Sequence, residues 1–314
     1  MLTTIAQHIN QLITSFPDDD AIILNNQRYP LNKVNYTPIT ASSFSSSPIA
    51  FVDGGQTEIL AAGNFCLSFI RIFAQVFNNN QKTESFLNEF YLFTQTVLEQ
   101  EKLVYTSMIF PLQEKLISEQ DLTISSVDQS IRTGNERAPI AKVISMARRF
   151  AELALASKIT ASSIILDGTL EATYPNEEKY VQLLPSTACA LAKSSSLFTA
   201  AGNSPTILLS KHSPGGCWSY QLTSKTAFVK LHPAAKHIFR FEGDPAVLPS
   251  LVQNSSDALF LGYPYGLMFV DRMARVSNEE KKLRTMQFLA KQQNKDLAVY
   301  LANTNAHNIL DSLG

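Results

Sequence analysis

Cysteine is scarce in this sequence of 314 residues, which contains only Cys66, Cys189 and Cys217. Three scattered cysteines are too few for a disulfide framework or a zinc site, so we expect a reducing compartment, the cytoplasm. Positive and negative charges nearly balance, since the formal net charge is -1. This balance excludes a protein that coats nucleic acid by bulk electrostatics, although it leaves room for a local basic channel.

Long apolar runs are also missing. Polar or charged residues interrupt every run before it reaches the length of a membrane span, and the first residues lack the basic and apolar segments of a secretory signal. We therefore expect no membrane association. No GxxxxGK[ST] loop and no internal repeat are present, which excludes a P-loop NTPase and a repeat architecture.

Two apolar runs that each end in Asp-Gly stand out among the features present. Residues 49–52 lead to Asp53 and two glycines, and residues 163–166 lead to Asp167 and one glycine. Each run predicts a buried strand with a carboxylate where the strand emerges. Two carboxylates at one edge of a sheet repel unless a cation lies between them, and Mg²⁺ and Mn²⁺ prefer carboxylate oxygens. Because Asp-Gly is also a common turn dipeptide, a pair of simple turns is the alternative.

The rest of the chain mixes strand and helix patterns. Strands are expected at residues 65–73, 89–96, 103–110, 218–222, 227–231, 237–241 and 259–261. Helices are expected at residues 3–16, 139–158, 178–192, 267–276, 278–292 and 306–310, with a helix plus loop over residues 112–134. Residues 86–98 also fit a helix. An antiparallel meander after a strand that ends in Asp is one half of a ribonuclease-H-like sheet. We therefore predict an α/β fold in a single domain over residues 1–314, with a helix and linker at 1–47 and the core at 48–314.

Glu152 is a further candidate residue, because it lies in an apolar part of the helix predicted at residues 139–158. Its simplest interpretation is a salt bridge with Arg148 four residues earlier, which we favour on spacing alone.

Taken together and in order, these segments resemble the NurA nuclease family. The resemblance spans roughly residues 48–310, and it is carried by residues 51–55, Glu152, residues 166–170, residues 193–195, and residues 262–265 followed by 270–272. It implies a ribonuclease-H-like mixed sheet flanked by helices, with inserted strands and helices. It also implies a homodimeric DNA nuclease that depends on Mn²⁺ or Mg²⁺. Such a nuclease acts in DNA repair and end resection with a HerA-type hexameric ATPase.

The resemblance also implies roles for individual residues. Asp53 and Asp167 would be metal ligands on strands, and Glu152 would be a ligand on a helix. Asp271 would be the fourth ligand, at a position where many family members have His. His307 is the reserve candidate for that ligand, and its alternative is a histidine at the surface or at a helix end.

A mechanism follows from this ligand set. Two ions about 4 Å apart would hold the scissile phosphate, one activating the attacking water and the other stabilising the leaving oxygen. Lys193 would contact a phosphate oxygen or stabilise developing negative charge. Arg272 and Arg275 would guide the DNA backbone, or be solvent-exposed charges. Tyr263 and Tyr265 would stack on bases or, as a pair beside proline more often does, pack internally.

Two other functions remain open on the sequence. Residues 53–57 and 167–169 superficially resemble the phosphate loops of actin-like ATPases and sugar kinases, but the late Gly-Gly segment that binds adenosine in that group is missing. The chain would then be an ATP phosphotransferase. Alternatively, a nuclease fold with a degenerate metal site would serve as a non-catalytic adaptor for an ATPase ring, and Asp271 is the feature that keeps this hypothesis open.

Overall fold

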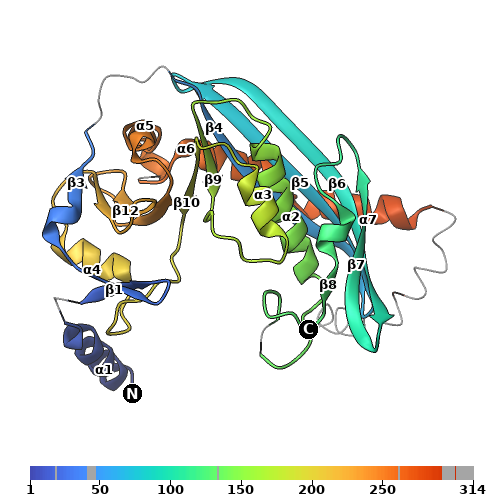
Figure 1. Ribbon diagram of the computed structural model, residues 1–314, viewed down its shortest axis with the longest axis horizontal. Coiled ribbons are helices and arrows are strands. Elements are labelled where there is room, and N and C mark those ends of the chain that lie inside the picture. Colours follow the sequence, from blue (N-terminus) through green and yellow to red (C-terminus); the bar gives the residue numbers. More distant parts are fainter. Residues whose placement is uncertain (18–19, 41–46, 133, 261, 292–300, 302–314) are drawn as a thin grey trace. The chain divides into compact units, whose positions relative to one another are not determined.

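The computed structural model describes residues 1–314 apart from 18–19, 41–46, 133, 261, 292–300 and 302–314 (Figure 1). The chain divides into two compact units. The small unit comprises Met1–Ser46, Asp167–Thr169 and Cys189–Tyr265. The large unit comprises Ser47–Leu166, Leu170–Ala188 and Gly266–Gly314. Every helix among the described residues is too short or too polar to span a bilayer.

The large unit is built on a sheet with the strand order β9-β4-β5-β6-β7-β8. These strands are β9 (Ser163–Asp167), β4 (Ile49–Ala62), β5 (Phe65–Asn78), β6 (Gln81–Glu99), β7 (Lys102–Pro111) and β8 (Ile124–Ser125). The strands β4 to β8 pair antiparallel, whereas β9 pairs parallel to β4, so the sheet is mixed. Asn79 and Asn80 both have positive φ in the two-residue turn after β5, which fits the turn type that matches strand twist.

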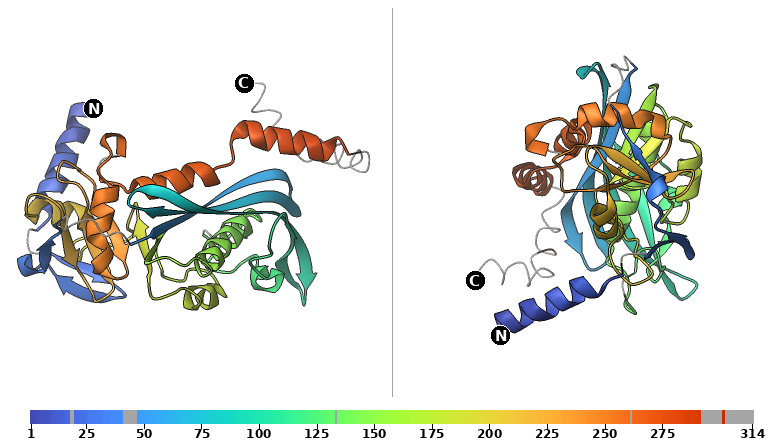
Figure 2. Two further views of the ribbon diagram at one scale, coloured as in Figure 1. Left: turned by 90° about the horizontal axis from the view of Figure 1, so that it is seen from above. Right: turned by 90° about the vertical axis from the view of Figure 1, so that its left-hand side faces the viewer.

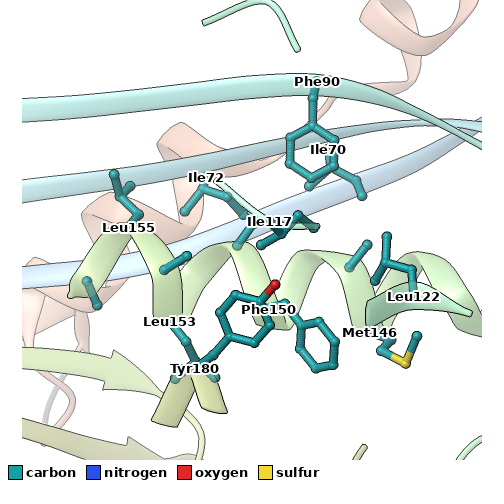
Figure 3. Close-up of a cluster of buried hydrophobic side chains, with 14 of the residues drawn as sticks. Ile70, Ile72, Phe90, Ile117, Leu122, Met146, Phe150, Leu153, Leu155 and Tyr180 are labelled. Carbon is teal, nitrogen blue, oxygen red and sulfur yellow. The ribbon is translucent and has the colours of Figure 1, made fainter. Parts of the chain in front are cut away.

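Helix α2 (Lys142–Ala156) covers one face of this sheet. Its apolar residues recur at helical spacing, so one side of the helix is buried against β4, β5 and β6. Phe150 also stacks on Tyr180 of α3 (Glu177–Gln182), with ring centroids 4.9 Å apart. Figure 3 shows these two rings with Ile70, Ile72 and Phe90 of the strands in the main core.

Helices α6 (Tyr265–Ala274) and α7 (Asn278–Leu289) lie on the other face of the sheet (Figure 2). Gly266 permits this packing, because a Cβ there would lie 2.2 Å from the ring of Phe51 in β4. Helix α7 has no buried residue, but Phe288 and Leu289 pack against the strands and polar contacts add to this packing. Arg71 of β5 bonds to Glu280 at 2.7 Å, and Arg284 donates to the hydroxyl of Tyr91 in β6 at 2.9 Å.

The small unit combines a short hairpin, β1 (Ala21–Leu24) with β2 (Gln27–Pro30), and a further set of strands. Their order is β3 (Tyr36–Pro38), β11 (Trp218–Gln221), β12 (Thr226–Lys230), β13 (Phe239–Glu242) and β10 (Ala188–Ala192). Its helices are α1 (Leu2–Ser15), α4 (Pro205–His212) and α5 (Leu248–Asn254). Trp218, Tyr220 and Phe228 are fully buried at the centre of its core.

The predicted α/β class with a mixed sheet flanked by helices is confirmed, and several elements differ. Residues 112–134 contain the short 3-10 helix η2 (Glu119–Leu122) and the strand β8, and no α-helix among the described residues. Residues 178–192 divide into α3 and strand β10. Residues 259 and 260 lie in the 3-10 helix η4 (Ala258–Phe260) rather than in a strand, and residue 261 lies outside the described residues. The helix predicted at residues 306–310 lies outside the described residues.

Candidate functional site

Asp53 lies inside strand β4 and not at its end, which corrects the sequence prediction. Pairing of β4 with β5 continues to Ala62, but its parallel pairing with β9 ends at Val52 opposite Leu166. Asp53 and Asp167 each follow the last residue of that parallel register. Asp53 is only 7% exposed, so its charge needs compensation within the fold.

The glycines after Asp53 serve close packing and not a turn. A Cβ at Gly54 would lie 2.5 Å from Oε1 of Glu152, and a Cβ at Gly55 would lie 2.0 Å from the carbonyl oxygen of Ala274. Successive residues of a strand point to opposite faces. The two glycines therefore let α2 approach one face of β4 and the end of α6 approach the other.

Arg148 of α2 joins the two buried carboxylates. Its Nη1 donates to Oε1 of Glu152 at 2.6 Å and to the carbonyl of Gly54 at 3.0 Å, and it lies 3.8 Å from Oδ1 of Asp53. The salt bridge expected between Arg148 and Glu152 is therefore present. It is also more than a surface pair, because Glu152 is buried and the same guanidinium faces Asp53.

Asp167 has a basic partner in the small unit. Nζ of Lys193 lies 2.6 Å from Oδ2 of Asp167 and 5.2 Å from the ring centroid of Tyr263. Gly168 has a φ of +110°, so the chain turns directly after the strand as the Asp-Gly pair predicts. Tyr263 is buried and meets Phe239 edge-on at 5.2 Å, which supports a packing role for its ring.

Asp271 and the two arginines lie on or just beyond α6. Oδ2 of Asp271 accepts a hydrogen bond from Arg275 at 2.7 Å, and Arg272 and Arg275 are exposed. Ala274, three residues after Asp271 on the same side of the helix, is the residue that packs on Gly55. The end of α6 therefore lies on β4 two residues from Asp53. His307 lies outside the described residues.

No three His, Cys, Asp or Glu side chains lie close enough to hold a metal ion, as far as the described residues go. The pair of Asp53 and Glu152 nevertheless fits a hard divalent cation in its chemistry. Both offer oxygen donors, both are buried, and the fold already places the positive charge of Arg148 beside them. Arg148 thus compensates part of the negative charge of both carboxylates.

Sequence reasoning treated Arg148 only as the partner of Glu152 and missed its contact with β4. Ser145, Arg148 and Glu152 follow the spacing i, i+3, i+7, so they form a polar stripe on a helix that is otherwise largely buried. Gln56 of β4 bonds to Ser145 at 3.0 Å and to Arg148 at 3.2 Å. That stripe was the signal in the sequence, because a buried helix rarely carries three aligned polar residues without a partner.

A search of protein-family models gives no match, and a search of curated proteins gives none either. Among solved structures, the fold is similar to that of the NurA nuclease from Sulfolobus solfataricus. The TM-score is 0.53 at 11% identity, and the match covers 94% of this chain and 95% of that one. This likeness supports the predicted ribonuclease-H-like fold and the resemblance to NurA.

More distant matches include endonuclease V from Ciona intestinalis, with a TM-score of 0.35, 13% identity, and coverage of 76% of this chain and 87% of that one. Human ENDOV gives a TM-score of 0.38 at 10% identity, with 76% of this chain and 85% of that one covered. These two scores are too low to support an argument.

Proposed function

We propose that this protein is a divalent-metal-dependent DNA nuclease that hydrolyses phosphodiester bonds during DNA end processing. The observation that carries the proposal is the grouping of Asp53, Arg148 and Glu152 where β4 loses its parallel neighbour. Two buried carboxylates beside one strand are costly unless they serve a purpose. Because the fold is similar to that of the NurA nuclease, we infer that these carboxylates serve phosphodiester hydrolysis.

In this proposal Asp53 and Glu152 hold Mn²⁺ or Mg²⁺, in a site that takes two ions when complete. A bound divalent ion supplies Lewis-acid stabilisation of the charge on the phosphate. Arg148 holds the carboxylates in place through its bonds to Glu152 and the Gly54 carbonyl. Lys193, positioned by Asp167, donates a hydrogen bond to a phosphate oxygen, and the exposed Arg272 and Arg275 contact the backbone of the strand.

The proposed partners follow from the same similarity. We propose that the protein acts as a homodimer in the cytoplasm and receives DNA from a HerA-type hexameric ATPase. The resemblance of the sequence to NurA, together with the similarity of the fold, is what supports these partners. Size-exclusion chromatography with light scattering tests the dimer. Co-purification with a HerA-type ATPase tests the second partner.

The central experiment is a cleavage assay. Purified protein is incubated with end-labelled linear DNA plus Mn²⁺, Mg²⁺ or EDTA. We expect cleavage with metal only, and a loss of at least a hundredfold in the variants Asp53→Asn and Glu152→Gln. Glu99→Gln, at an exposed end of β6, is the control for losing one carboxylate. Full activity of Asp53→Asn in a folded preparation would overturn the proposal.

The roles of Asp167 and Asp271 as further ligands stay predictions, and so does the role of His307. Asp167→Asn and Asp271→Asn test them in the same assay, each with Mn²⁺ titrated. If the residue is a metal ligand, the variant that lacks it should need more Mn²⁺ for half-maximal cleavage. A residue that only forms an ion pair with Lys193 or Arg275 should leave the Mn²⁺ requirement unchanged.

A further inference from the structure

A polar cavity in the small unit has no role in the mechanism above. Its volume is about 660 Å³, and three lysines line it: Lys193, Lys211 and Lys236. Hydroxyl groups of serine and threonine line it as well, and no carboxylate is found among the described residues of the lining. We call this cavity the lysine pocket. Three lysines thus give the lining a cationic character, although Lys193 also forms an ion pair with Asp167.

Secondary structure holds these groups in place. Ser204 is the residue before α4, and its hydroxyl bonds to that of Thr206 at 2.8 Å in the first turn. Buried Leu208 and Leu209 anchor α4, so Lys211 in its last turn is presented from a packed helix. Lys236 is exposed two residues before the buried Ile238. The pocket is thus formed by α4, the residues that follow β10 and the segment that leads into β13.

The chemistry of the pocket matches a phosphodiester. Lysine ammonium groups bind phosphate as point charges, and serine and threonine hydroxyls donate hydrogen bonds to phosphate oxygens. The volume lies within the range of about 300–1,000 Å³ that small-molecule sites occupy, which is far more than one phosphate ion fills. A ligand of nucleotide size fits better than a free anion. Lys193 belongs both to this pocket and to the ion pair with Asp167.

We propose that the lysine pocket binds the backbone of a single DNA strand through a phosphate and its neighbouring nucleotide. The inference rests on the proposed function, because it places this strand segment beside Lys193. Lys211 and Lys236 contact the phosphate, and the hydroxyl groups of Ser204 and Thr206 complete its hydrogen bonds. The pocket selects for charge and not for base sequence, since lysines and hydroxyls carry no base-reading pattern.

The test is a binding measurement in EDTA, so that cleavage does not interfere. The probe is a fluorescein-labelled 12-nucleotide oligothymidylate, and fluorescence anisotropy gives Kd at several salt concentrations. The double variant Lys211→Ala/Lys236→Ala should bind at least tenfold more weakly than wild type. The slope of log K against log salt should fall by about 1.4, as expected for two lost contacts to a single strand.

The matched control is Lys33→Ala/Lys225→Ala, which removes two exposed lysines of the same unit that do not line the pocket. We expect less than a twofold change in Kd, and thermal unfolding of both double variants should match wild type. An oligothymidylate with an uncharged methylphosphonate backbone should bind wild type and the pocket variant equally weakly. Equal losses in the two double variants, or no loss in the pocket variant, would overturn the inference.

The same preparations separate this inference from the proposed function. If wild type cleaves DNA with Mn²⁺ and the pocket variant binds as wild type does, the pocket inference alone is wrong. If wild type cleaves nothing but the pocket variant loses binding, the nuclease proposal is wrong and the pocket remains a strand-binding site.

Discussion

The backbone of Gly54 lies directly against the carboxylate of Glu152, so that a Cβ at Gly54 would be 2.5 Å from Oε1 and 2.8 Å from Cγ of Arg148. Gly54→Ala must therefore push both side chains away from β4. We expect the free energy of unfolding to fall by about 1–3 kcal/mol, as for other overpacked sites. Under the proposed function, DNA cleavage should fall more than tenfold. Urea denaturation and the cleavage assay measure the two effects.

Gly63→Ala is the control, because a Cβ at Gly63 has no atom within 4 Å. The free energy of unfolding should change by no more than about 0.5 kcal/mol. If Gly54→Ala proved as stable and as active as Gly63→Ala, the close packing of Glu152 on β4 would contribute to neither stability nor cleavage.

Arg148→Ala removes the positive charge between Asp53 and Glu152. Two buried carboxylates then lose their contact with this guanidinium, and we expect a loss of about 3 kcal/mol in stability. A divalent cation should replace the lost charge if Asp53 and Glu152 can bind one. Mn²⁺ should therefore raise the thermal midpoint of Arg148→Ala more than that of wild type, as measured by differential scanning fluorimetry with EDTA as the reference.

Arg149→Ala is the matched control on the same helix. Arg149 bonds to Glu177 at 2.8 Å, and Glu177 is also buried, so its loss should destabilise the protein to a similar degree. Our proposal places no metal ion beside Arg149 and Glu177. The thermal midpoint of Arg149→Ala should therefore be the same in Mn²⁺ and in EDTA. Equal Mn²⁺ effects on both variants would contradict a specific site at Asp53 and Glu152.

Much of the fold was predictable because its signals are local. The apolar period of α2 and the alternation at residues 237–241 depend only on neighbouring residues, and α2 and β13 occur close to where the sequence predicts them. The extent of β4 was not predictable in this way. Asp-Gly-Gly looks locally like a turn, whereas the true reason for both glycines is the approach of Glu152 and Ala274 from distant segments.

In the candidate site too, contacts between residues close in sequence were predictable and contacts between distant segments were not. The i, i+4 spacing predicts the salt bridge between Arg148 and Glu152, because a helix brings these residues together by itself. The contact of Arg148 with Asp53 depends on where the parallel register with β9 ends, which no local pattern contains. Likewise, the i, i+4 spacing at the end of α6 accounts for the pair of Asp271 with Arg275.

Glu280 should make stability depend on pH. Burial raises its pKa, but hydrogen bonds from Arg71 and Arg284 outweigh burial, and the pKa falls below its ordinary value of 4.5. A lowered carboxyl pKa stabilises the fold above the unfolded value and loses that effect as pH falls through the folded value. Glu280→Gln should therefore cost about 1–3 kcal/mol at pH 7, and this difference from wild type should shrink below about pH 4.5.

Denaturant unfolding at pH 7, 5, 4 and 3 measures this dependence. Glu279→Gln is the control, because Glu279 is the exposed neighbour of Glu280 and does not contact Arg71 or Arg284 in any described bond. It should have the smaller effect at pH 7. A constant difference between Glu280→Gln and wild type over this pH range would show that the ionised carboxylate does not attach α7.

The three thiols should be slow to react in the folded protein. Burial, with the nearby Glu58 carboxylate, raises the pKa of Cys66 to about 12, and burial raises that of Cys189 to about 11. The pKa of the half-buried Cys217 is raised by burial as well. The thiolate is the reactive form, so a raised pKa leaves little of it at pH 8. Ellman's reagent should therefore modify Cys217 first, and Cys66 and Cys189 only as fast as the chain unfolds. In guanidinium, all three thiols should react with the reagent at once. Immediate reaction of three thiols in the native chain would contradict the packing of Cys66 in the main core and of Cys189 against Gly243.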